Sequence, residues 1–202
     1  MKPIRERLRE WVSGRRRSPA DRQSVVSQHL PCGSTGAEIG VWKGGFSAFL
    51  LREIAPRRLH LVDPWKFEQS YAESLYGGLE AKSQADMDAI HDDVARRFRD
   101  EIARGQVVLH RSTSQQAASS LEDESLDWVY IDANHLYEFV RADLHAFLPK
   151  VRVGGLITGD DYAEGGWWKG GVKRAVDEFI RESGCEVVAL KERQYVLRRK
   201  PG

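Results

Sequence analysis

The chain has few cysteines, no net excess of charge and no long apolar run. Its two cysteines, Cys32 and Cys185, have no second thiol nearby at a metal-ligand spacing, which argues against a cysteine-based metal site. No apolar stretch is long enough for a signal peptide or a membrane span. We therefore expect a cytoplasmic protein without a membrane-spanning segment.

The charges nearly cancel, because 31 Lys and Arg face 30 Asp and Glu and leave a net charge of +1. This balance argues against a general nucleic-acid binder, which needs a strongly basic field. The basic residues are nevertheless concentrated between Lys2 and Arg17. We expect residues 1–30 to form a basic helical arm or lid that either meets an acidic surface or packs on the rest, and 31–202 to form one domain.

The segment from Ser34 to Phe46 has the pattern of a buried strand that leads into a helix through a glycine turn. A dinucleotide fingerprint fits poorly, because only Gly40 and the Gly44-Gly45 pair are present. Glu38, two residues before Gly40, would sit badly beside a pyrophosphate and well beside the cationic groups of S-adenosylmethionine. The turn therefore favours S-adenosylmethionine over a dinucleotide.

A second apolar strand, Leu59 to Val62, ends in Asp63-Pro64-Trp65. An acidic residue at the end of this strand is placed to accept hydrogen bonds from the ribose hydroxyls of a nucleoside ligand. The alternative is that Asp63 only begins a turn before proline. Trp65 is a candidate to cover the adenine or the pocket mouth, and simple packing is the alternative.

The next connection, residues 66–105, is longer than usual. Its first half is an insertion where a substrate lid could lie, and its second half has helical spacing with Ser83 as a candidate cap. A third strand, 107–110, precedes Ser112 and Thr113. Their hydroxyls either reach the adenine edge or cap the helix that follows.

Two further strands, 126–131 and 156–157, again alternate with helical segments. The last segments, 186–190 and 195–197, favour a closing antiparallel hairpin. The order predicts an α/β fold with a mostly parallel, seven-stranded sheet, helices on both faces and ligands at the carboxyl ends of the strands.

Asp132, Asp160 and Asp161 follow neighbouring strands of this sheet, so we expect them to gather at one edge of the ligand crevice. Three carboxylates without a counter-charge would repel one another, and a divalent cation such as Mg²⁺ relieves this. His135, which we expect in the first turn of the following helix, would act as general base toward a hydroxyl. The alternative is that all four are caps, turn residues or a surface histidine.

The sequence resembles class I S-adenosylmethionine-dependent methyltransferases of the macrocin O-methyltransferase family in four segments. These are the stretches around Glu38 and Asp63, the run from Leu126 to Tyr162 and the helix ending at Phe179. The resemblance implies a Rossmann-like methyltransferase fold, Mg²⁺ on the three aspartates, His135 as base and sugar hydroxyls as acceptors. Catechol-type enzymes have lysine where His135 stands. The candidate cofactor-binding residues are Glu38, Gly40, Gly44, Asp63, Trp65, Ser112, Thr113 and Asp132.

We therefore expect a Mg²⁺-dependent O-methyltransferase that acts on a small molecule, a sugar or glycosylated metabolite, and not on nucleic acid. Trp167, Trp168 and Tyr71 are candidates for the acceptor pocket, because aromatic faces suit sugar rings, or else for packing. Alternatives are a metal-independent methyltransferase and a non-catalytic nucleoside-binding protein. The incomplete glycine pattern disfavours a nicotinamide-dependent oxidoreductase, and a homo-oligomer stays open.

Overall fold

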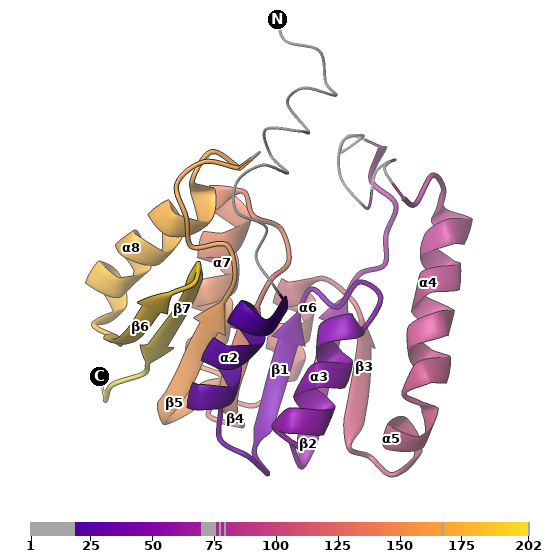
Figure 1. Ribbon diagram of the computed structural model, residues 1–202, viewed down its shortest axis with the longest axis horizontal. Helices are drawn as coiled ribbons and strands as arrows, with labels where there is room; N and C mark the ends of the chain where they lie inside the picture. The colour runs from indigo at the N-terminus through magenta and orange to yellow at the C-terminus, as the bar shows by residue number, and fades with distance from the viewer. Residues whose placement is uncertain (1–18, 70–75, 77, 79, 167, 202) are drawn as a thin grey trace, which may run out of the picture.

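A computed structural model of the chain describes residues 19–69, 76, 78, 80–166 and 168–201 (Figure 1). Its strands form a seven-stranded sheet in the order β3-β2-β1-β4-β5-β7-β6. The first five strands pair in parallel, and β7 pairs antiparallel with both β5 and β6. The strands are β1 (Thr35–Ile39), β2 (Arg58–Asp63), β3 (Val107–Arg111), β4 (Leu126–Ile131), β5 (Val151–Gly159), β6 (Glu186–Lys191) and β7 (Gln194–Arg198).

Helices cover both faces of the sheet, as expected for alternating strands and helices. They are α2 (Pro19–His29), α3 (Gly45–Glu53), α4 (Gln84–Arg97), α5 (Arg99–Ala103), α6 (Ser114–Ser120), α7 (Tyr137–Phe147) and α8 (Gly171–Ser183). The buried side chains of α2, α3 and α4 belong to one core, and those of α6, α7 and α8 belong to another. In Figure 1, α2 and α3 lie in front of the sheet and α7 lies behind it. The predicted fold class is confirmed.

Strand β4 shows how the sheet separates the two cores. Trp128 and Tyr130 pack into the core with α3, whereas Val129 and Ile131 pack into the core with α7 and α8. Successive side chains of a strand point to opposite faces, and a strand covered on both faces is apolar throughout. This burial fixes the register that brings the carboxyl ends of β1, β4 and β5 together.

The closing hairpin is also confirmed. Glu192 and Arg193, which join β6 to β7, have φ angles of 52° and 58°. Positive φ at both central residues of a two-residue loop matches the twist of a hairpin. The amide of Tyr162 donates to the carbonyl of Arg193, so the hairpin tip lies against the loop after β5.

Three boundaries differ from the sequence expectation. Strand β5 begins at Val151, five residues before Leu156, and a shift in its register with β4 accommodates the extra length. The helical segment after Ser83 divides at Phe98, where φ is −109° and ψ is 20°. Helix α2 begins at Pro19, two residues before the expected cap at Asp21. The expected helix within the basic arm, Tyr71 and Trp167 lie outside the described residues.

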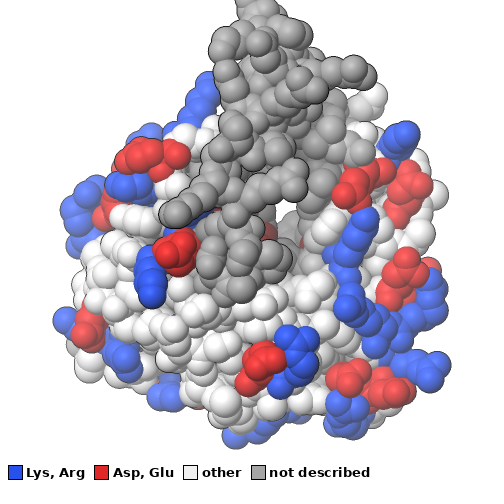
Figure 2. Space-filling model, in the orientation of Figure 1, with Lys and Arg blue, Asp and Glu red and all other residues white. Residues whose placement is uncertain are grey.

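Charges of both signs are interspersed on the face shown in Figure 2, in agreement with the nearly balanced composition. Acidic and basic side chains often adjoin, as in the pairs Arg152–Asp127 and Lys150–Asp123. In the described part of the chain, no helix combines the length and the apolar character needed to cross a membrane.

Candidate active site

The glycine turn after β1 lies against the carboxyl end of β4. Gly40 has a φ of 94°, and a Cβ at this position would lie 2.3 Å from the carbonyl oxygen of Asp132. Only glycine permits both this backbone conformation and this close approach. Gly44, with φ 68°, precedes the first turn of α3. The turn therefore brings the start of α3 close to the loop that carries Asp132.

Glu38 lies below this turn, 1% exposed, and accepts a 2.6 Å hydrogen bond from the Ser47 hydroxyl. Burial raises the pKa of Glu38 to about 8, although the Ser47 hydrogen bond and the charge of Arg22 oppose the rise. A buried carboxyl with this pKa is largely protonated at neutral pH, and a cationic ligand nearby would favour its ionisation.

Asp63 holds the glycine turn in place. Its Oδ2 accepts hydrogen bonds from the amides of Val41 and Trp42 at 3.0 and 2.9 Å and from the Tyr76 hydroxyl at 2.7 Å. Its Oδ1 accepts the amide of Trp65 at 2.8 Å. Asp63 is 1% exposed, so a ribose that binds its carboxylate would have to replace one of these partners. Three of the partners are backbone amides, and the fourth is the side-chain hydroxyl of Tyr76.

The other candidates for the nucleoside side of the site lie in different environments. Trp65 is fully buried, and its indole N–H donates to the Trp42 carbonyl. Trp65 therefore packs in the core, as the alternative to a pocket role predicted. Thr113 caps α6 in a reciprocal arrangement with Gln116, so the capping alternative holds for Thr113. Ser112 is half-buried, and its amide donates to the Asp63 carbonyl.

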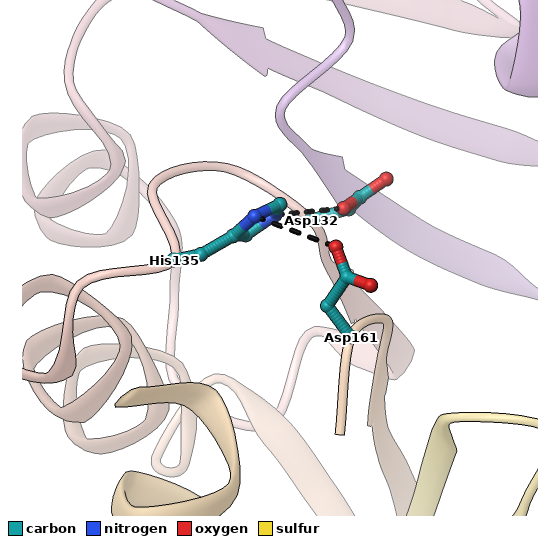
Figure 3. Close-up of side chains that lie close together, drawn as sticks. All are labelled: Asp132, His135 and Asp161. Carbon is teal, nitrogen blue, oxygen red and sulfur yellow. Dashed lines mark hydrogen bonds and ion pairs between the residues drawn. The ribbon is translucent and has the colours of Figure 1, made fainter. Parts of the chain in front are cut away.

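Asp132, His135 and Asp161 lie together at the carboxyl edge of β4 and β5 (Figure 3). The imidazole of His135 lies between the two carboxylates, with Nε2 3.2 Å from Oδ1 of Asp132 and Nδ1 3.4 Å from Oδ2 of Asp161. One ligand atom from each of the three residues lies within 4.8 Å of the others. The sequence predicted this juxtaposition from the strand ends.

His135 lies in the loop before α7, and the expectation that it belongs to the first helical turn is wrong. The Asn134 side chain accepts the Leu136 amide, and α7 begins only at Tyr137. This hydrogen bond competes with helix formation. A Cβ at Gly171 would lie 2.8 Å from the His135 carbonyl, so α8 packs closely against the loop. Trp168 meets the His135 ring edge-on at 5.0 Å and is 5% exposed.

The carboxylates already have protein counter-charges, which the sequence reasoning missed. Arg22 of α2 pairs with Asp132 at 2.8 Å and approaches Asp160 at 3.6 Å, and Arg193 at the hairpin tip pairs with Asp161. The Gln194 amide donates to Asp160 at 2.5 Å. These partners come from distant segments of the chain, so no local pattern predicts them. The one indication in the sequence is that three aspartates gathered at one edge need a counter-charge.

These contacts shift the ionisation of the cluster. Burial opposes ionisation of Asp132, but Arg22 and His135 outweigh it and hold the pKa of Asp132 below its usual value. Burial also lowers the pKa of His135, yet the hydrogen bond to Asp132 and the carboxylate charges produce a net rise. Burial and the neighbouring Asp160 raise the pKa of Asp161.

The donor set suits a divalent cation in part. Asp132 and Asp161 offer the oxygen ligands that Mg²⁺ prefers, and the imidazole of His135 lies in the same group. Asp160, the third expected metal ligand, lies outside this group of three and faces Gln194 and Arg22. Of the three expected metal ligands, Asp132 and Asp161 belong to this group.

Comparison with known proteins agrees with this fold. Residues 37–162, more than half of the chain, match a family described as a methyltransferase domain. The solved O-methyltransferase NovP is 21% identical, with 89% of this chain and 80% of NovP covered at a TM-score of 0.61. Fibrillarin from Aeropyrum pernix, solved with bound S-adenosylmethionine, is 14% identical at a TM-score of 0.57, with 88% of this chain and 72% of that chain covered. No curated protein sequence matches.

The fold of this chain is therefore one that solved methyltransferases such as NovP share. The chain belongs to the methyltransferase-domain family.

Proposed function

We propose that this protein is an O-methyltransferase that transfers the methyl group of S-adenosylmethionine to a hydroxyl, with a divalent cation such as Mg²⁺ at Asp132 and Asp161. The observation that carries the proposal is the cluster of Asp132, His135 and Asp161 beside the glycine turn that follows Glu38. Parallel α/β sheets bind ligands at this edge, where strand order reverses. Here the reversal lies between β1 and β4.

Each part of the edge has a role in the proposal. Glu38 and the glycine turn bind the cationic methionine end of S-adenosylmethionine, and Asp63 orders the turn through its amide hydrogen bonds. His135 accepts the proton of the attacking hydroxyl as the carbon–sulfur bond breaks. A divalent cation on the two aspartates supplies the charge that lowers the pKa of such a hydroxyl.

A cation at this place would change the charge state of His135. The carboxylates hold the pKa of His135 above its ordinary value, which favours the protonated ring. A general base has to be neutral before it accepts a proton. Positive charge beside Asp132 and Asp161 would counteract the effect of these carboxylates on the imidazole and favour its neutral form.

We propose a sugar or glycosylated metabolite as the acceptor. Trp168 lies edge-on against His135, but it is 5% exposed and packs into the core with α7 and α8, so its placement is that of the packing alternative. NovP is itself an O-methyltransferase with the same fold. The nearly balanced charge of the chain argues against nucleic acid as the acceptor.

A metal-independent methyltransferase is the second candidate. The observation that favours it is the Arg22 guanidinium, which already compensates the charge of Asp132 at 2.8 Å. In that case His135 would act without metal assistance, and chelation would leave methyl transfer unchanged.

The test is transfer of a labelled methyl group from S-adenosylmethionine to a panel of free and glycosidic sugars, with Mg²⁺ or with EDTA. We expect transfer that EDTA abolishes and that His135→Ala reduces roughly 10²- to 10⁴-fold. His145→Ala, on α7 near Glu182, is the matched control and should retain wild-type activity. Undiminished transfer by His135→Ala would contradict the role of this residue, and full activity in EDTA would select the second candidate.

A further inference from the structure

Arg22 occupies a built site at the edge of the sheet. Its guanidinium pairs with Asp132 at 2.8 Å and lies 3.6 Å from Asp160. The side chain is 23% exposed, and its Nε is buried without a hydrogen-bond partner in the described part of the chain. A surface arginine would keep this nitrogen hydrated, so the side chain is held here at a cost.

An aromatic surface completes the site. The guanidinium carbon lies 3.8 Å from the ring centroid of Phe46 and 4.9 Å from that of Tyr130. These two rings contact one another, with centroids 4.6 Å apart. Aromatic faces attract cations, and the attraction grows when the cation is partly desolvated. Two carboxylates and two rings thus surround one positive group.

The partners of Arg22 are themselves fixed by the fold. Gln194, 1% exposed, accepts the Tyr130 hydroxyl at 2.6 Å and donates to Asp160 at 2.5 Å. Asp132 is held by its hydrogen-bonding contact with His135. The site therefore exists independently of Arg22, which reaches it from α2, a helix anchored by the buried Val25 and Val26.

We propose that the place between Asp132, Asp160, Phe46 and Tyr130 is a cation-binding site of the enzyme, and that Arg22 is an internal competitor which a cationic ligand group has to displace. The proposal rests on the proposed function, because the ligand is one of its two positively charged groups. These are the divalent metal, which at Asp132 and Asp161 would share Asp132 with this place, and the sulfonium and ammonium of S-adenosylmethionine. Arg22 thereby weakens binding of that ligand.

The coupling is reciprocal by thermodynamic necessity. If Arg22 lowers the affinity for a cation, the bound cation must loosen the contact between Arg22 and the aspartates. An enzyme without Arg22 has one positive charge fewer beside Asp132 and Asp160 until a ligand arrives. Its thermal stability should therefore depend more strongly on ligand concentration than that of the wild type.

The test compares the full-length wild type with Arg22→Met, which keeps the length and apolar stem of the side chain but removes its charge. Arg22→Gln also removes the charge and serves where the methionine variant fails to fold, whereas Arg22→Lys keeps the charge and is a control. Arg52→Met is the matched control, because Arg52 also approaches an aromatic ring, Phe49 at 5.8 Å, but lies on the exposed side of α3. Mn²⁺ alone and S-adenosylmethionine alone are titrated calorimetrically, and melting temperatures are measured with each.

We expect Arg22→Met to bind one of the two probes about tenfold or more tightly than wild type and to show the larger rise in melting temperature. The probe that gains identifies the displaced charge, and Arg22→Lys and Arg52→Met should bind like wild type. Unchanged affinity of Arg22→Met for both probes, with wild type binding S-adenosylmethionine, would overturn the competition and leave the proposed function standing. Absence of binding to every variant would overturn both.

Discussion

The carboxylate of Asp63 should contribute more to stability than any single exposed ion pair of the protein. Four donors converge on it, three on Oδ2 and one on Oδ1. Asp63→Asn keeps one oxygen, so at best the amide retains the three donors at Oδ2 and turns its NH₂ toward the Trp65 amide. One buried donor then loses its acceptor, and three hydrogen bonds lose an ionised acceptor.

An unsatisfied buried donor costs about 1–3 kcal/mol, and hydrogen bonds to charged groups exceed neutral ones by roughly 1 kcal/mol each. Burial disfavours the charged form and raises the pKa of Asp63, which offsets part of these losses, so we expect Asp63→Asn to lower the free energy of unfolding by about 3 kcal/mol. Tyr76→Phe removes one donor and leaves the carboxylate with its three amide partners, so it should cost about 1 kcal/mol. The assay is equilibrium urea denaturation followed by circular dichroism.

Two results would refute this reasoning: an Asp63→Asn variant within about 0.5 kcal/mol of wild type, or a larger loss for Tyr76→Phe than for Asp63→Asn. Hydrogen exchange at Val41 and Trp42 adds a local measurement, because these amides should exchange faster in Asp63→Asn. Replacing Asp63 can lower ligand affinity in two ways, by displacing the glycine turn and by removing a ribose contact. The stability of the variant therefore has to be measured together with its ligand affinity.

Three further changes test other parts of the account. Burial raises the pKa of Asp143 to about 6. The protonated carboxyl of Asp143 therefore stabilises the fold fully below about pH 4, and this stabilisation is lost as the pH rises through 6. Urea unfolding at several pH values should show wild type losing about 3 kcal/mol over this range relative to Asp143→Asn. Gly40→Ala should cost about 3 kcal/mol or more in the same assay, since its Cβ meets the Asp132 backbone, whereas Gly105→Ala, with open space around it, should cost about 1 kcal/mol. Thr113→Ala should cost about 1 kcal/mol through loss of the helix cap, and equal stability would contradict the capping.

Much of the fold could be predicted from the sequence, because apolar strands alternate with helical patterns. Strands buried on both faces, such as β4, have continuous apolar runs, and their order places acidic residues at one edge. Asp132 and Asp161 were expected together from this logic, and His135 was expected beside them from its position three residues after Asp132. The closing hairpin was found from two short segments separated by charged residues.

The details that failed depend on contacts between distant segments. Nothing local to Arg22 indicates that it reaches Asp132, which lies far along the chain. The start of α7 depends on whether the Asn134 side chain accepts the Leu136 amide, a choice that helical periodicity does not reveal. Trp65 follows a strand in the sequence as a pocket residue would, yet its burial depends on α3 and α4 packing around it.

We propose above that this edge of the sheet binds S-adenosylmethionine beside Glu38. Calorimetric titration of S-adenosylmethionine into the wild-type protein, in buffers of different ionisation enthalpy near pH 7, tests it most directly. The account predicts binding in the micromolar range, roughly −8 kcal/mol. It also predicts release of protons, because the raised pKa of Glu38 leaves its carboxyl protonated until a cation arrives. Absence of binding up to millimolar ligand would contradict the account.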